Sequence, residues 1–121
     1  MEKFQLRDTS SGVKFDLLAA NGQVILSSEV YRSRAAARKE IASIQAIAAA
    51  AGVENHTEEP RQVLPNPKFE LYWDKAGNYR FRLKARNGKI VGVSGSYSQK
   101  TGALNGIESV RCNAGPADTD E

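Results

Sequence analysis

The sequence predicts an α+β domain in which two tandem β-β-β-α repeats form one continuous antiparallel sheet with packed helices and pseudo-two-fold symmetry. Three observations lead to this prediction. The stretch from Lys68 to Ile107 echoes the stretch from Lys3 to Ile41, with identical residues at many matching positions. An Asn-Gly pair stands at the same place in both copies, and an apolar helical stripe follows each set of strands. A fixed internal period indicates one supersecondary unit used twice.

The length of 121 residues suits one domain. We divide it into repeat one (1–56), a proline-containing connection (57–67), repeat two (68–114) and an acidic tail (115–121). The only charged side chains of the tail are acids, and we expect this terminal segment to be disordered. The repeats therefore account for nearly all of the predicted structure.

The first two strands of repeat two alternate apolar and polar residues, which is the period of a half-buried strand. In the first strand, Phe69, Leu71 and Trp73 share one face, so we expect Trp73 to pack in the core or at its rim. In the second strand, every polar position is a cation. Its apolar positions are Tyr79, Phe81, Leu83 and Ala85.

The Asn-Gly pairs predict the next hairpin of each repeat. Asn-Gly favours a two-residue type I′ turn, which needs positive φ at both positions. In repeat two, Asn87-Gly88 then places Ala85 opposite Ile90. In repeat one the same turn places Ala19 opposite Val24 and Leu17 opposite Leu26.

A helix is predicted after each set of strands. Ser33 is expected to cap the first helix and Gly52 to end it. The second helix should end near Gly115 and carries Gly102 and Gly106 in its first two turns. Each glycine costs up to about 1 kcal/mol relative to alanine, so we expect the helix backbone to pack closely on the sheet. The inward stripes are Ala37, Ile41, Ile44 and Ala48, then Ala103, Ile107, Val110 and Ala114.

One shared core follows from these patterns, because a single repeat cannot bury its apolar face alone. Burial at about 1.5–3 kcal/mol per large side chain offsets a substantial share of the ordering entropy. The predicted core residues are Phe4, Leu6, Phe15, Leu17, Ile41, Ile44, Phe69, Leu71, Phe81, Leu83, Ile107 and Val110.

Several segments of repeat two match a known family: Phe69-Glu70-Leu71-Tyr72, 77–85, Asn87-Gly88, Tyr97 and 106–110. They closely resemble the YegP-like proteins, a mainly bacterial family of unknown function. Repeat one is a weaker copy, with Glu40 where repeat two has Gly106. The resemblance implies a single antiparallel sheet built from two units, with exchange of terminal strands between them. It brings no catalytic residues.

Composition argues against several classes of protein. The net charge is +3 and the mean hydropathy is −0.48, and no apolar run approaches the roughly 20 residues that span a bilayer. A lone cysteine excludes an internal disulfide and favours a cytoplasmic location. Cys112 and His56 are single members of their types, so we expect no nucleophilic pair, metal site or cofactor. We therefore predict that the protein is not an enzyme.

A row of cations is the candidate binding site. Arg80, Arg82, Lys84 and Arg86 project from one face at a spacing of about 6.6–6.8 Å, which is comparable to that of successive phosphates. Tyr72 on the neighbouring strand shares this face. We expect this row and Tyr72 to contact an anionic partner.

The plainer interpretation of the same row is a solvated strand face. Alternation requires polar residues on an exposed strand, and Glu70 and Asp74 lie close enough to pair with some of the arginines. Both interpretations stay open from the residues alone.

The expected function is that of a small interaction module contacting a protein or another anionic macromolecule through the basic face of repeat two. The alternative is a single-stranded nucleic-acid binder using the same face. We expect no membrane contact. We also expect a monomer with internal pseudo-dimer symmetry, although strand exchange could instead produce a homodimer.

Overall fold

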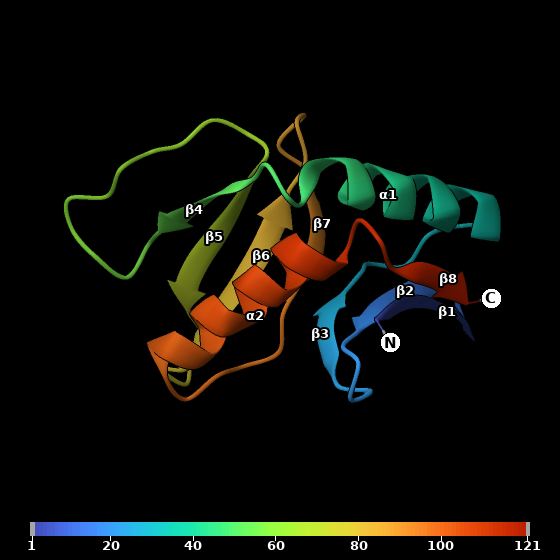
Figure 1. Ribbon diagram of the computed structural model, residues 1–121, viewed down its shortest axis with the longest axis horizontal. Coiled ribbons are helices and arrows are strands. Elements are labelled where there is room, and N and C mark those ends of the chain that lie inside the picture. The colour runs from blue at the N-terminus through green and yellow to red at the C-terminus, as the bar shows by residue number, and fades with distance from the viewer. Residues whose placement is uncertain (1, 121) are drawn as a thin grey trace.

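Within residues 2–120, a single mixed sheet and two helices make up the fold, which confirms the α+β class and the tandem repeat (Figure 1). The computed structural model describes residues 2–120. Repeat one contains β1 (Lys3–Thr9), β2 (Gly12–Leu18), β3 (Val24–Ser27), α1 (Arg34–Ile47) and β4 (Gly52–Asn55). Repeat two contains β5 (Lys68–Trp73), β6 (Tyr79–Lys84), β7 (Ile90–Val93), α2 (Lys100–Asn113) and β8 (Asp118–Asp120).

The two repeats exchange their last strands. The order across the sheet is β4-β5-β6-β7-β3-β2-β1-β8. Strand β4 follows α1 in the chain but pairs with β5, and β8 follows α2 but pairs with β1 (Figure 1). Both exchanged pairs are parallel, whereas the other pairs are antiparallel. The sheet is thus continuous and mostly antiparallel, and each repeat is completed by the other.

The prediction of a disordered tail over 115–121 is wrong for the part that the structure describes. Asp118–Asp120 pair with β1 as β8, and Ala117 is buried. The side chain amide of Gln45 holds the preceding turn by donating to the carbonyls of Ala114, Gly115 and Ala117. The edge of β1 presents backbone N–H and C=O groups, and a segment of any side-chain composition can form hydrogen bonds with them. The acidic composition of the tail therefore does not prevent it from forming a strand. Glu121 lies outside the described residues.

The pseudo-two-fold axis passes between β3 and β7. Their ladder consists of the pair Ser27 and Val93, which hold equivalent positions in the two repeats. Leu26 and Gly92 are equivalent in the same way, and a Cβ at Gly92 would lie 2.6 Å from Leu26 Cγ. The strands approach closely here because one position carries a large side chain and its equivalent carries none.

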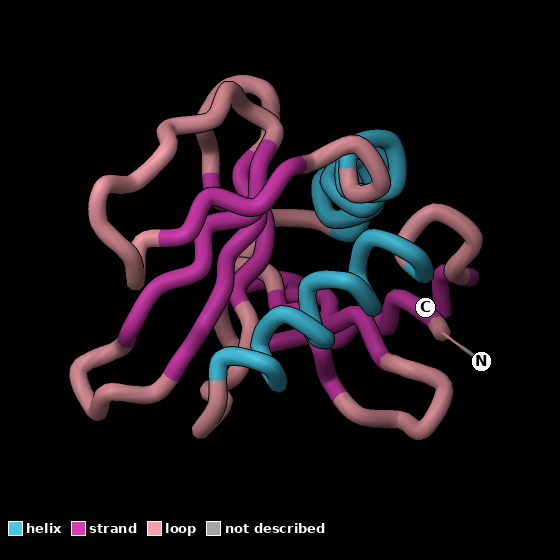
Figure 2. The backbone as a smooth tube through the Cα atoms, turned by 60° about the vertical axis from the view of Figure 1, so that its left-hand side comes forward, coloured by secondary structure: helices cyan, strands magenta, loops and turns pink. Residues whose placement is uncertain are grey.

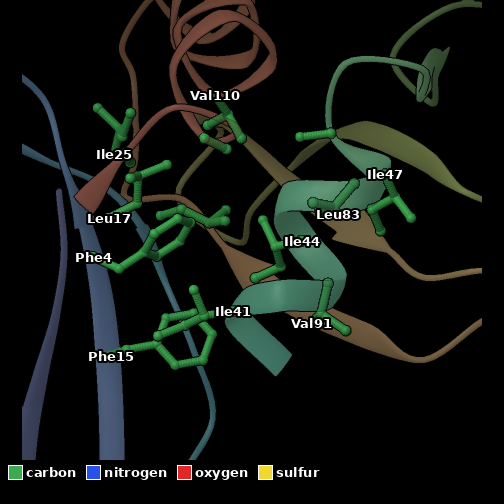
Figure 3. Close-up of a cluster of buried hydrophobic side chains, with 14 of the residues drawn as sticks. Phe4, Phe15, Leu17, Ile25, Ile41, Ile44, Ile47, Leu83, Val91 and Val110 are labelled. Carbon is green, nitrogen blue, oxygen red and sulfur yellow. The ribbon is translucent and has the colours of Figure 1, made fainter. Parts of the chain in front are cut away.

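A single hydrophobic core joins the halves. Figure 3 shows side chains from β1 and β2 converging with Leu83 of β6 and Val91 of β7 around Ile44 and Ile47 of α1. All of the predicted core residues are buried. The prediction of one shared core is confirmed.

The turns differ from the predicted type. Gly88 has φ 82° and Gly22 has φ 85°, and no other residue type within 2–120 has positive φ. Each turn therefore has one left-handed residue, as in a three-residue loop with a type I turn and a glycine bulge. Asn87 Oδ1 accepts from the Lys89 N–H at 3.0 Å. This hydrogen bond stabilises Asn87 in a conformation with negative φ.

The turn type shifts the register beside it by one residue. Ala85 N–H donates to Lys89 O at 2.9 Å, so the prediction that Ala85 faces Ile90 is wrong. The prediction that Ala19 faces Val24 is wrong for the same reason, since Leu18 takes that position. A bulge then restores the alignment, and the predicted pair farther from the turn, Leu17 with Leu26, forms as expected. In repeat two the equivalent pair is Leu83 with Gly92.

The first helix begins as predicted. Ser33 Oγ accepts from the Ala36 N–H at 3.1 Å as the cap of α1. The expected end at Gly52 is wrong: α1 ends at Ile47, and Gly52 begins β4 because pairing with β5 outweighs further helix. Neither helix described is long and apolar enough to cross a membrane.

Close packing of α2 is confirmed at Gly106. A Cβ there would lie 2.6 Å from Tyr97 Oη and 2.9 Å from Phe81 Cε2. At Gly102 the nearest atom would be Tyr97 Cδ1 at 3.2 Å. The first position has no room for a methyl group, and the second has nearly enough.

Candidate binding face

The predicted cations lie on the side of the sheet away from the helices, which we call the outer face. Figure 2 shows the strands in two groups with both helices in the angle between them. Phe81 is fully buried on the helix side of β6, so Arg80, Arg82 and Lys84 project from the outer face. Lys14 holds the equivalent place to Arg80 on β2.

Arg86 does not belong to this row. Strand β6 ends at Lys84, and Arg86 is exposed in the three-residue turn that follows. The expected four-residue row is wrong at this position because the turn contains three residues instead of two. The outer face of β6 therefore presents three cations.

Glu70 neutralises two of these three cations. Its side chain is 3% exposed on β5, directly opposite Arg82. Arg82 Nε lies 2.6 Å from Oε1 and Lys84 Nζ lies 3.3 Å from Oε2. Burial by itself would raise the pKa of Glu70, but the hydrogen bonds and charges of Arg82 and Lys84 lower it overall. The ion pairing with Glu70 that the plainer interpretation expects is therefore present, at Arg82 and at Lys84.

Tyr72 is also occupied. The guanidinium carbon of Arg82 lies 4.7 Å from the centre of the Tyr72 ring, which is a cation–π contact. One face of this ring is thus covered by a residue of the protein itself.

A second buried carboxylate comes from the exchanged strand. Glu54 of β4 lies beside Glu70 and is 4% exposed. Its Oε1 accepts from Lys68 Nζ at 2.8 Å and from the Leu64 N–H at 2.7 Å, and its Oε2 lies 2.6 Å from His56 Nε2. Burial alone would raise the pKa of Glu54, but the bonds from Lys68, Leu64 and His56 lower it to about 2.

Sequence reasoning did not find this cluster. Lys68-x-Glu70 places two polar side chains on one face of a strand, and Glu54-x-His56 has the same spacing at the end of β4, so this spacing was the available signal. The two pairs meet only because β4 leaves its own repeat to join β5.

The cluster does not resemble a metal site, although ligand atoms of Glu54, His56 and Glu70 all lie within 4.8 Å of one another. Lys68 Nζ already lies 2.8 Å from Glu54 and 3.7 Å from Glu70, and Arg82 and Lys84 contact Glu70. The side chains of Lys68, Arg82 and Lys84 thus meet two carboxylates, and a metal ion would have to displace an ammonium group. We describe it as a buried ion-pair network.

Cys112 and His56 do not form a pair. Cys112 is exposed on α2. Its Sγ lies 3.7 Å from Glu108 Oε1. His56 contacts the outer-face carboxylates, so the sheet separates it from the helix side.

Arg80 differs from its neighbours because two hollows meet at its side chain. The seam hollow, of about 360 Å³, lies between β3 and β7, and the hairpin hollow, of about 560 Å³, lies at the tip of the β5–β6 hairpin. Within residues 2–120 no ion pair reaches Arg80, and its Nε is buried without a hydrogen-bond partner. The seam hollow is lined by Lys14, Val24, Ser27, Ser28, Glu29, Arg80, Ile90, Gly92, Val93, Ser94 and Gly95. The hairpin hollow is lined by Tyr72, Trp73, Asp74, Lys75, Ala76 and Arg80.

Trp73 lies at the hairpin hollow and is 53% exposed. The prediction that Trp73 packs in the core or at its rim is right about the side of the strand and wrong about core burial. It is the last residue of β5, where the apolar side of the strand leaves the core, and its ring contacts Tyr79 with 6.0 Å between centroids. An exposed tryptophan therefore lies beside the unpaired arginine.

Known proteins share this fold and its duplication. The family model for a domain of unknown function (DUF1508) matches twice, over residues 8–55 and 74–121. The UPF0339 protein YegP of Yersinia pestis is 39% identical over 111 residues, which is 91% of this chain and 86% of that protein. A UPF0339 protein of Treponema denticola is 57% identical over 47 residues, which is 39% of this chain and 81% of that protein. The second relative therefore corresponds to one repeat.

Two solved structures agree with the architecture. The solution NMR structure of yegP from E. coli has a TM-score of 0.77 at 31% identity, and that of a UPF0339 protein from Shewanella oneidensis has 0.79 at 30%. Each comparison covers 98% of this chain and 90% of the other. The family model matches both repeats, and the Yersinia pestis relative is 39% identical over 91% of this chain. The chain therefore belongs to the DUF1508 (UPF0339, YegP-like) family, whose function is unknown.

Proposed function

We propose that this protein is a small, non-enzymatic binding module that engages an anionic macromolecule through the outer face around Arg80. One observation carries the proposal: Arg80 lines both hollows and has no acidic partner among the described residues. Arg82 and Lys84, by contrast, neutralise Glu70. The contact is thus centred on one arginine instead of a row.

The energetics of Arg80 support a ligand. A buried N–H without an acceptor costs about 1–3 kcal/mol, and Arg80 Nε is in this state. An oxyanion can accept two parallel hydrogen bonds from a guanidinium group. Lys14 in the seam hollow and Lys75 in the hairpin hollow add positive charge on either side.

The polar cluster supports binding more than catalysis. A general acid–base group needs a pKa near the working pH. Cations lower the pKa of Glu54 to about 2 and also lower that of Glu70, so both stay ionised. Neither carboxylate is therefore suited to give or take a proton at neutral pH.

Single-stranded nucleic acid is a second candidate partner, favoured by the exposed Trp73. Proteins that bind single strands combine cations that follow the backbone with aromatic rings on which bases stack. Trp73, Lys75 and Arg80 provide both kinds of group around one hollow. Tyr72 is less suited than expected, since Arg82 lies over its ring.

Affinity capture with two arginine variants tests the proposal. Arg80→Gln should lose the partner that the wild-type protein captures and keep the wild-type melting temperature. Arg82→Gln should lower stability because Glu70 then lacks its closest cation. Lys39→Gln, an exposed change on α1, serves as the control of equal charge. A partner captured equally by wild type and Arg80→Gln contradicts the proposal.

Titration with a fluorescent oligouridylate at low salt tests the second candidate. Contacts from Lys14, Lys75 and Arg80 predict a slope of log affinity against log salt of about −2. Trp73→Ala should weaken binding by about 1–3 kcal/mol if a base stacks on the ring. Absence of binding at low salt removes this candidate and leaves the first one intact.

A further inference from the structure

The seam hollow lies at the pseudo-two-fold axis and is lined by one cation from each repeat. Lys14 and Arg80 hold equivalent positions, each one residue before the buried phenylalanine of its strand. Since β3 meets β7 at the axis, the two repeats bring both cations to the same hollow. The volume of about 360 Å³ lies at the small end of the range for ligand sites.

The hydroxyl groups in the hollow are already used. Ser28 Oγ accepts from the Phe15 N–H at 2.9 Å and donates to Glu29 O at 2.7 Å. Ser94 repeats both contacts in the second repeat. Ser27 Oγ donates to Asp16 at 2.7 Å. Recognition of a ligand in this hollow therefore depends on Lys14 and Arg80.

The two cations are not neutralised by the protein. No ion pair joins Lys14 or Arg80 to an acid in the part of the chain that the structure describes. Glu29 is the acid in the lining, it is exposed, and its equivalent in repeat two is Gly95. The charged lining thus carries two positive charges and one negative charge.

We propose that the seam hollow binds a phosphate group between Lys14 and Arg80. A dianion matches the two cations and keeps a net attraction in the presence of Glu29, whereas a monoanion gains less. The inference deepens the proposed function and rests on it through Arg80, which both sites share. The phosphate can be a monoester on a small molecule or at the end of an oligonucleotide, because both carry the same dianionic group, whereas a backbone phosphodiester carries one negative charge.

Titration with inorganic phosphate tests the site in the intact protein. Backbone amide resonances of the lining residues Gly92, Ser94 and Gly95 are followed by NMR at constant ionic strength. We expect saturable shifts confined to the hollow, with acetate binding more weakly. Absence of saturation, shifts spread over the whole surface, or equal binding of acetate overturns the proposal.

Four variants assign the site to its side chains. Lys14→Gln and Arg80→Gln should each weaken phosphate binding by about tenfold or more, as expected for a lost charge-assisted hydrogen bond. Glu29→Gln should strengthen it, which a variant that is merely damaged cannot do. Lys39→Gln on α1 should leave it unchanged. Wild-type affinity in Lys14→Gln, or weaker binding in Glu29→Gln, overturns the assignment.

Two further probes separate this inference from the proposed function. Inorganic phosphate and oligouridylate are titrated in parallel into Lys14→Gln and Trp73→Ala. Phosphate binding that depends on Lys14 supports the inference, whether or not a macromolecule binds. Macromolecular binding that depends on Arg80, without any phosphate site, leaves the proposed function standing and overturns the inference.

Discussion

At the residue scale, the outer face carries two buried carboxylates whose cations come from different strands. Glu54 is held by Lys68, and Glu70 is held by Arg82 and Lys84. The equivalent of the first pair in repeat one is Lys3 with Asp120, at 3.2 Å, and both of these side chains are exposed. The same geometry is thus present twice, once buried and once in solvent.

The pKa of Glu54 leads to a prediction about acid stability. Its folded-state pKa of about 2 lies below its ordinary value of 4.5. A lowered pKa increases the free energy of unfolding at any pH above the ordinary pKa of 4.5. This contribution is lost as the pH falls from 4.5 toward about 2. The urea midpoint of the wild type should therefore fall steeply over this range. Glu54→Gln should be less stable at neutral pH and show a flatter dependence, measured by circular dichroism.

Asp120→Asn is the matched control for this change. The Lys3–Asp120 pair is exposed, and such pairs contribute about 1 kcal/mol or less. Its urea midpoints should follow those of the wild type at each pH. Equal behaviour of Glu54→Gln and Asp120→Asn would contradict the buried-network account.

Strand alternation predicted part of this chemistry. It placed Glu70 near the arginines, and the Glu70–Arg82 pair is formed. It could not bring Glu54 to Glu70, because that contact depends on which repeat receives β4. Trp73 illustrates a different limit: alternation gives the side of a strand but not where the core ends.

At the element scale, α2 packs closely on the sheet because it has a glycine, Gly106, at the point of contact. Gly106 faces Phe81 and Tyr97, whereas Glu40 takes the equivalent position in α1. At this position α2 brings bare backbone to its strand, whereas α1, which has equal length, carries the side chain of Glu40.

Two alanine substitutions in α2 should have different effects. Gly106→Ala gains helix propensity but places a methyl group 2.6 Å from Tyr97 Oη, and overpacking of this kind costs about 1–3 kcal/mol. Gly102→Ala meets Tyr97 at 3.2 Å and should stay within about 1 kcal/mol of the wild type. Thermal unfolding of both variants measures the difference. Equal stabilities would show that the helix can move away from the sheet.

The hairpins show why an element can be predicted and its register missed. Asn-Gly correctly located both turns, but the asparagine binds the backbone two residues on instead of adopting positive φ. This choice between a two-residue and a three-residue loop moved Arg86 off the strand. Both loops suit the same dipeptide, so the dipeptide alone does not decide between them.

At the scale of the whole molecule, each repeat is incomplete without the other. The core contains residues from both, and β4 and β8 each complete the sheet of the opposite repeat. The duplication in the sequence predicted the shared core. The exchange of strands was implied only by the family resemblance, because strand pairing between repeats leaves no local pattern.

Dividing the chain in the connection tests this dependence. Fragments 1–61 and 62–121, produced separately, should each lack cooperative unfolding because a neighbouring strand and half of the core are missing. Mixed together, they should recover the native circular dichroism spectrum and form a one-to-one complex in native mass spectrometry. A fragment that unfolds cooperatively as a monomer would contradict the account.

Leu26 against Gly92 shows what covalent duplication permits. In a symmetric pair of separate single-repeat chains, any residue on the axis meets its own copy and has to be compatible with itself. Here the two positions belong to one chain and differ, so the bulky side chain of Leu26 lies against a glycine that has no side chain. The same freedom lets the equivalent positions in the lining of the seam hollow differ, as Glu29 differs from Gly95 and Lys14 from Arg80. Fusion thus turns a self-complementary junction into one whose two sides can specialise separately.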